Sequence, residues 1–269
     1  IGDFLVSSGS DDIGFYATFT TNTPCETSEN LIDLQNHING IATLTQPQLL
    51  SIRDVFQVQP ICLRDQENIL LAKSVIEDYD SQVGPLFSTP NTVNGFSKDP
   101  VAAPGLGLQR AMVALQQAVL DAIMTPEIYA AYPEHIEGWV FNSSYTFPGY
   151  VDPPTNPSVN NSVLIRANFA DPDGSNPYFD INADGTNHAL RPTGLYLAPG
   201  SIATVTVPNS LVGQDYYIRV GSHEWDLGIR GNFYRLDRIT KKFPINNNTI
   251  EVFNPFGGAI SILVPYGAD

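Results

Sequence analysis

The last third of the chain alternates short apolar runs with residues that favour turns. From Pro192 to Pro265 each run is rich in Val, Ile and Thr and is bounded by Gly, Pro or Asn. Such runs are typical of antiparallel strands, because β-branched side chains pack well on a pleated surface. With further strands expected at residues 139–147 and 159–170, the pattern predicts about seven or eight strands, enough for a two-sheet β-sandwich. The Asn254–Gly258 turn is expected to join the last two strands as a hairpin.

The first half of the chain has helical spacing instead. After an extended lead, apolar residues recur every three or four positions, which predicts amphipathic helices. Proline or a capping residue stands at several of the expected helix starts. The expected helices cover residues 31–41, 49–56, 65–82 and 108–123, with a short fifth helix beginning at Pro126. Acidic Glu77, Asp78 and Asp80 crowd the end of the third helix, where the simplest interpretation is solvent-exposed charge.

The balance of acidic and basic residues changes at the same place as the change from helical to strand-like spacing. Residues 1–138 hold 17 acidic and 5 basic side chains, whereas residues 139–269 hold 11 and 8. We therefore expect a boundary near Gly138, with a helical accessory domain at 1–137 and a β-sandwich at 138–269. The predicted fold class is α+β.

Composition excludes some partners. The chain has 28 acidic and 13 basic residues, which leaves no basic face for a phosphate backbone and argues against nucleic acid. No apolar run approaches the length of a membrane-spanning helix.

Three stretches carry a resemblance to a known family. They are TGLYLAPGSIATVTVP at Thr193–Pro208, RVGSHEWDL around His223, and NPFGGAISILVP at Asn254–Pro265. In this order they resemble the opening sandwich of enhancin-like zinc metallopeptidases, a family that includes secreted mucin-degrading enzymes. The resemblance implies a secreted or cell-surface protein, a bacterial source, and a glycoprotein or glycan as the partner.

The zinc site of that family is missing from this sequence. The family holds zinc with HExxH on a helix and a downstream Glu. The nearest approach here is His223–Leu227, in which Leu227 takes the place of the second histidine, and His37, His135 and His188 show no ligand spacing. No catalytic residue is therefore assigned. Zinc is expected in a catalytic domain that follows this chain, and the end of the sequence soon after a strand favours a truncated parent protein.

The chain contains two cysteines, Cys25 and Cys62. The secreted family context favours a disulfide between them, since neither lies in a CxxC or metal-ligand spacing. The alternative is a pair of buried free thiols.

One loop has the composition of a calcium site. Oxygen donors stand at Asp171, Asp173, Asn176 and Asp180, with a glycine between them. Calcium favours such donors in a loop that can turn sharply. An Asx-rich turn without an ion would have the same composition, so both interpretations remain open.

Aromatic residues give a second candidate surface. Trp225 and Tyr217 are the preferred glycan-stacking rings, although aromatic residues on strands commonly serve as core packing. The same group of candidates contains Trp139, Tyr145, Tyr150 and Tyr216.

Two functions follow from these observations. The first is the non-catalytic N-terminal part of a secreted zinc metallopeptidase that acts on glycoproteins, with its own downstream catalytic domain as a partner. The second is a stand-alone carbohydrate-binding or adhesin module without peptidase activity.

Overall fold

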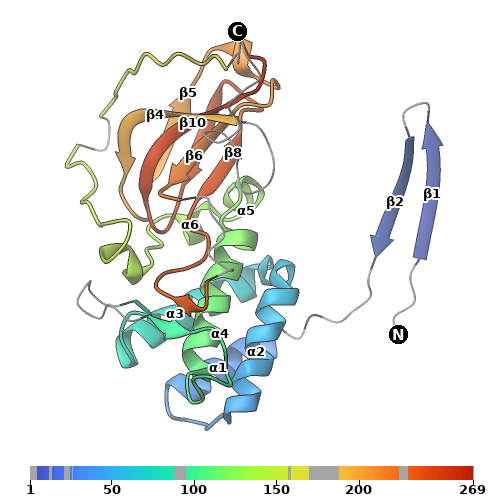
Figure 1. Cartoon of the computed structure of the whole chain (residues 1–269), viewed down its shortest axis with the longest axis vertical. Helices are drawn as coiled ribbons and strands as arrows, with labels where there is room; N and C mark the ends of the chain where they lie inside the picture. Colours follow the sequence, from blue (N-terminus) through green and yellow to red (C-terminus); the bar gives the residue numbers. More distant parts are fainter. Residues whose placement is uncertain are drawn as a thin grey trace.

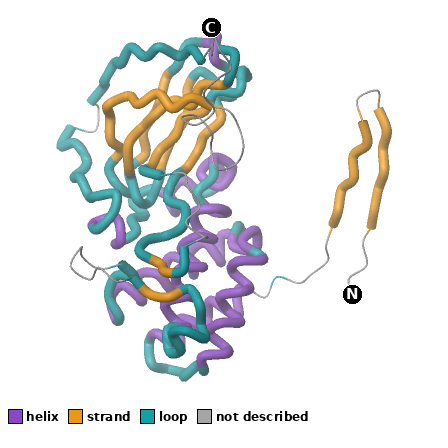
Figure 2. The backbone as a smooth tube through the Cα atoms, viewed as in Figure 1, coloured by secondary structure: helices purple, strands orange, loops and turns teal. Residues whose placement is uncertain are grey.

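The computed structural model describes residues 5–11, 14–20, 25, 27–87, 95–156, 159–169, 188–223 and 230–268. Helices gather at one end of the molecule and the larger antiparallel sheets at the other (Figures 1 and 2). The predicted α+β class is confirmed. None of the described helices is long and apolar enough to cross a membrane.

The helices lie close to where the sequence predicts them. The third begins where Asp65 Oδ1 accepts a hydrogen bond from the Asn68 backbone N–H at 2.9 Å, which satisfies one of the free donors of its first turn. At the start of the second, the Thr45 backbone N–H donates to Gln48 Oε1 at 2.9 Å. The helical elements are α1 (Thr27–Ile38), α2 (Gln46–Val58), a 3-10 turn (Pro60–Leu63), α3 (Gln66–Gln82), α4 (Gly107–Ala118), a π turn (Val119–Ile123), α5 (Pro126–Ala131) and α6 (Pro133–Ile136).

Strands pair antiparallel throughout the described residues. A four-stranded sheet has the order β4 (His188–Leu197), β10 (Gly258–Pro265), β6 (Tyr217–Gly221) and β8 (Lys241–Pro244). The two-stranded sheets pair β5 (Ile202–Thr206) with β9 (Thr249–Phe253), β3 (Phe96–Ser97) with β7 (Asn232–Phe233), and β1 (Leu5–Asp11) with β2 (Gly14–Thr20). Phe253 of β9 packs against Phe243 of β8 with ring centroids 5.0 Å apart, so the β5–β9 pair contacts the four-stranded sheet.

Two expected strands are absent, and those predictions are wrong. Residues 142–145 form a 3-10 turn in place of a strand, with the Ser144 N–H donating to Phe141 O at 2.8 Å. Ser143 and Ser144 are buried, and the Thr146 hydroxyl donates to Phe87 O at 3.0 Å, so contacts with distant residues hold this turn. Residues 159–168 form no strand, and a single bridge joins Phe169 to Ala268. Leu164 is fully exposed, so its apolar character does not mark a buried strand here.

The Asn254–Gly258 turn is a crossover between sheets, and the predicted hairpin is wrong. β9 pairs with β5, whereas β10 pairs with β4 and β6. Asn254 lies fully inside, where its side-chain amide donates to Val220 O and Ile239 O, both at 3.0 Å. Its Oδ1 accepts from the Phe256 N–H at 2.9 Å. The side chain thereby fixes the path of the backbone from one sheet to the other.

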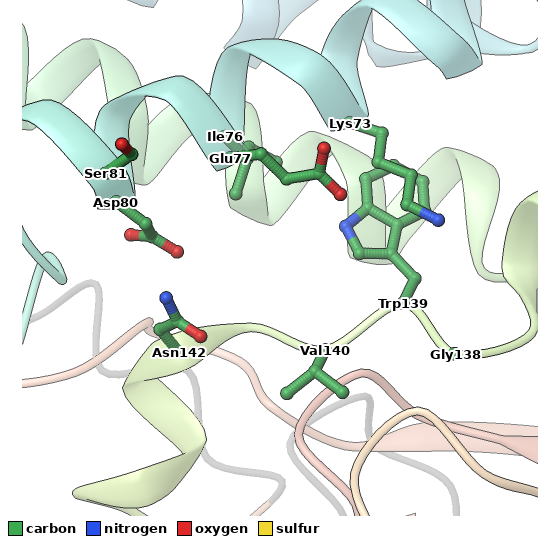
Figure 3. A pocket seen from close by; sticks show the side chains of 9 residues that line it. All are labelled: Lys73, Ile76, Glu77, Asp80, Ser81, Gly138, Trp139, Val140 and Asn142. Carbon is green, nitrogen blue, oxygen red and sulfur yellow. The ribbon is translucent and has the colours of Figure 1, made fainter.

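The helices and sheets share one continuous buried cluster. Residues 138–141 connect them, with Trp139 and Phe141 2% and 0% exposed (Figure 3). The Gly138 N–H donates to Gly200 O at 2.9 Å, and the Phe141 N–H donates to Pro255 O at 3.1 Å. Farther along the junction, Lys241 Nζ donates to Leu120 O at 2.5 Å, and burial lowers the pKa of this lysine to about 8. The division into domains at 137 and 138 stays a prediction, since the core runs across it.

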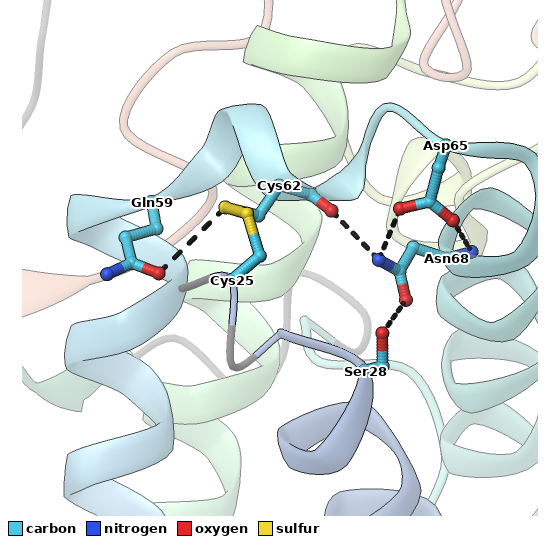
Figure 4. The surroundings of a disulfide bond; sticks show 6 residues. All are labelled: Cys25, Ser28, Gln59, Cys62, Asp65 and Asn68. Carbon is cyan, nitrogen blue, oxygen red and sulfur yellow. Dashed lines mark hydrogen bonds between the residues drawn. A yellow bond between two sulfur atoms is a disulfide. The ribbon is translucent and has the colours of Figure 1, made fainter. Parts of the chain in front are cut away.

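A disulfide joins Cys25 to Cys62, with the two Cα atoms 5.7 Å apart (Figure 4). It ties the chain ahead of α1 to the 3-10 turn ahead of α3. Beside it, the Asn68 side-chain amide donates to Cys62 O at 2.9 Å and accepts from the Ser28 hydroxyl at 2.8 Å. The covalent bond and this network hold the first turns of α1 and α3 together.

Removing the disulfide is expected to destabilise the helical part. The bond closes a loop over a sequence separation of 37, and the lost restriction of the unfolded chain corresponds to about 4 kcal/mol. A Cys25→Ser/Cys62→Ser variant should show this loss in urea unfolding followed by circular dichroism. Reductant should lower the unfolding midpoint of the parent protein and leave the double variant unchanged. An identical midpoint for the parent with and without reductant would contradict the pairing.

Asn254→Ala should lower the free energy of unfolding by about 3 kcal/mol, because it leaves buried backbone groups without partners. Asn246→Ala, in the exposed turn after β8, is the matched control and should change stability little. Thermal and urea unfolding of both variants check this expectation. Equal stability of the two variants would refute the role given to the buried amide.

Candidate functional site

A pocket of about 340 Å³ lies between α3 and the segment that connects the helices to the sheets. Figure 3 shows polar side chains entering it from both walls. Its lining comprises Lys73, Ile76, Glu77, Asp80, Ser81, Gly138, Trp139, Val140 and Asn142. The pocket therefore combines residues from the helical part with residues of the connecting segment.

Helical geometry places the first wall. Lys73, Glu77 and Asp80 are spaced four and three residues apart on α3, so their side chains share one face of the helix. The opposite wall begins at Gly138, whose φ of 74° lies in the left-handed region that favours glycine. The backbone hydrogen bonds of Gly138 and Phe141 attach this wall to the sheets. Each wall is thus held by a rigid element of the fold.

Trp139 is the largest side chain of the pocket. It is 2% exposed, and its indole Nε1 has no hydrogen-bond partner. Lys73 Nζ lies 5.7 Å from the centre of the indole ring, within the range of a cation–π contact. In Figure 3 the indole nitrogen is on the edge of the ring that faces the carboxylates of α3. A buried indole donor without a partner is unusual, because such groups nearly always find an acceptor.

Asp80 supplies the matching acceptor. Its Oδ1 is buried and has no hydrogen-bond partner, and burial raises the pKa of its carboxyl from 3.8 to about 6. The Asn142 side chain faces it across the pocket in Figure 3. The expectation that Asp80 is solvent-exposed charge is therefore wrong. Asp78, its neighbour, instead joins α3 to α1 by accepting from Gln35 Nε2 and Asn39 Nδ2, both at 2.9 Å.

The pocket can form hydrogen bonds with a polar ligand. It offers two carboxylates, an ammonium, an amide, a hydroxyl and an indole N–H within a small volume. Its lining contains neither a histidine nor a cysteine. Within the part of the chain that the structure describes, no group of three or more His, Cys, Asp or Glu side chains could hold a metal ion.

Of the two predicted glycan-binding rings, Tyr217 is described and is held by intramolecular contacts. It packs edge-on against His188 with ring centroids 5.4 Å apart, and its hydroxyl donates to Asp215 Oδ1 at 3.0 Å. Trp225 lies outside the described residues. So does the predicted calcium loop, Asp171, Asp173, Asn176 and Asp180. These assignments remain predictions.

One predicted candidate ring, Tyr145, is more exposed than Tyr217. Tyr145, 62% exposed, stacks on Tyr150 with ring centroids 4.3 Å apart and an interplanar angle of 7°. The Tyr196 hydroxyl donates to Gly149 O at 2.6 Å and secures the loop that carries the pair. The pair does not line the pocket between α3 and residues 138–142, which we call the junction pocket.

Sequence reasoning did not find the pocket, because its walls are far apart along the chain. The available signals were a tryptophan beside the predicted boundary at Gly138 and an acidic residue directly after the apolar stripe of α3. Neither signal indicates that the two side chains face one cavity.

Comparison with known proteins shows what the last part of the chain is similar to. The family model described as the N-terminal domain of M60-like peptidases matches residues 171–269. The resemblance inferred from the sequence is thereby confirmed. The pocket residues precede the matched segment.

Two relatives match this chain over fewer than 100 residues each. A TRPM8 channel-associated factor homolog of Danio rerio is 30% identical over 73 residues, which are 27% of this chain and 8% of that protein. A homolog of the same name from Xenopus laevis is 33% identical over 91 residues, 33% of this chain and 10% of that protein. The chain thus matches only about a tenth of the length of these relatives. No solved structure matches it.

The raised pKa of Asp80 gives a pH prediction. Between pH 4 and 6 the folded state keeps a proton that the unfolded state releases, so this carboxyl makes stability fall as pH rises through that window. Asp80→Asn should remove this component and flatten the pH dependence of the unfolding free energy. Urea unfolding at several pH values from 4 to 7 measures it.

Glu77→Gln, one turn away and exposed, controls for the change in net charge. A pH dependence of Asp80→Asn equal to that of the parent protein would contradict the burial of this carboxylate.

Proposed function

We propose that this chain is the non-catalytic N-terminal portion of a secreted or cell-surface zinc metallopeptidase that acts on glycoproteins such as mucins. The observation that carries the proposal is the match of residues 171–269 to the N-terminal domain of M60-like peptidases. The disulfide between Cys25 and Cys62 supports an oxidising, extracytoplasmic location.

The catalytic zinc is assigned to a domain outside this chain. The sequence contains no HExxH, and the histidines His37, His135 and His188 lie on α1, α6 and β4. These residues do not fit a catalytic zinc site. In the parent protein, the metal would activate a water for attack on a peptide carbonyl. The role left for this chain is to bind substrate or to support the catalytic domain.

A stand-alone carbohydrate-binding or adhesin module is the second candidate. The exposed ring of Tyr145, stacked on the half-buried Tyr150, favours it, because an exposed aromatic ring suits the apolar face of a sugar. The names of the vertebrate relatives refer to association with a channel. The shared segment covers a tenth or less of those proteins, so we do not extend that association to this chain.

Peptidase activity is expected only in the natural protein that contains this segment together with a catalytic domain. That protein should cleave a mucin-type glycopeptide in the presence of zinc and lose the activity with a zinc chelator. This chain alone should cleave nothing under the same conditions. Mass spectrometry of the glycopeptide detects the products.

The matched control is the natural protein with the catalytic Glu of its zinc motif replaced by Gln. No cleavage by the intact parent protein, together with glycan binding by this chain on an array, would replace the proposal with the binding-module function. Cleavage by the isolated chain would overturn both assignments.

A further inference from the structure

The junction pocket holds a hydrogen-bond donor and an acceptor that nothing in the fold satisfies. Trp139 Nε1 is the donor and Asp80 Oδ1 the acceptor, and both are buried. A buried polar group without a partner costs about 1–3 kcal/mol. The residues that carry these two groups line the same cavity. One ligand that displaces the side chains covering the two atoms can therefore pair with both.

The pair of groups limits the chemistry of the ligand. A purely cationic ligand such as an amine would donate to Asp80 and leave the Trp139 N–H unpaired. An anion would accept from Trp139 and be attracted by Lys73, but it would face two carboxylates, Glu77 and Asp80, against that one ammonium. An apolar ligand would satisfy neither group. A group of neighbouring hydroxyls both donates and accepts, and meets both requirements.

The size and rim of the pocket suit a single ring. A volume of about 340 Å³ is at the small end of the range for ligand pockets. Around the two buried groups, the exposed side chains of Glu77, Ser81 and Asn142 add acceptors and an amide donor. These groups match hydroxyls distributed around the edge of a sugar.

We propose that the pocket between α3 and residues 138–142 binds one neutral sugar residue, whose hydroxyl groups pair with Trp139 Nε1 and Asp80 Oδ1. Both atoms are closed to solvent in the present arrangement. For a sugar hydroxyl to reach them, side chains of the pocket lining must therefore change rotamer.

This inference goes beyond the peptidase proposal, and it gives the second candidate function, carbohydrate binding, a site separate from Tyr145 and Tyr150. The proposed function concerns a catalytic domain elsewhere, whereas the pocket belongs to this chain and lies before the matched segment. Sugar binding can therefore be tested without any peptidase, and failure of one proposal leaves the other intact.

Tryptophan fluorescence tests the inference directly. The sequence contains two tryptophans, Trp139 and Trp225, so a Trp225→Phe variant of the whole chain keeps only the reporter in the pocket. Galactose, fucose, N-acetylglucosamine and N-acetylgalactosamine are titrated separately. At least one should change the emission of Trp139 in a saturable manner. Asp80→Asn in the same background should weaken that binding about tenfold, since a hydrogen bond to a charged group is lost.

Asp54→Asn is the matched control, because this carboxylate is exposed on α2 away from the pocket lining. It should leave the sugar affinity unchanged. Circular dichroism and the unfolding midpoint of each variant show that the fold is retained. Trp139→Phe, followed by heteronuclear NMR shifts of the pocket backbone, removes the indole N–H without emptying the site and should also weaken binding.

Three results would overturn the inference. The first is no change in Trp139 emission with any of the four sugars up to about 100 mM, a concentration that still detects very weak sites. The second is a response to methylammonium or guanidinium alone, which would make the pocket a cation site. The third is equal sugar affinity in the parent and in Asp80→Asn.

Discussion

The burial of Trp139 and Phe141 between the helices and the sheets is the interaction on which the rest of the structure depends. Both side chains are almost fully buried, and Phe141 packs edge-on against Phe256 of the crossover between β9 and β10 with ring centroids 5.3 Å apart. Because the apolar cluster passes without a break through this segment, the helices and the sheets stabilise each other. A substitution at Trp139 or Phe141 should therefore destabilise both the helices and the sheets.

The same junction creates the pocket. Backbone hydrogen bonds hold the Gly138–Asn142 wall to the sheets, and the face of α3 forms the other wall. The register of α3 is set at its first turn, where Asp65, Asn68 and the disulfide at Cys62 are joined by hydrogen bonds. Precise placement of Asp80 therefore depends on contacts four turns away along one helix. The unpaired polar groups of the pocket lower the stability of the fold locally, and the packing of the surrounding core offsets this loss.

The family match and the pocket belong to different parts of the chain. The match to the M60-like N-terminal domain begins at residue 171, whereas the pocket is formed by residues 73–142. The matched part carries the likeness to M60-like peptidases. The helical part with its junction pocket adds a polar cavity that the family model does not cover.

Local patterns in the sequence determined the helices, the α+β class and the resemblance to the peptidase family. Helical periodicity and capping residues are properties of neighbouring residues, so the prediction for α1 to α5 needed no distant partner. The tertiary structure alone decided that residues 142–145 turn, that Asn254 directs a crossover, and that Asp80 and Trp139 line one pocket. Each of these outcomes depends on contacts between residues far apart in sequence, and burial against a distant surface overrides local preference.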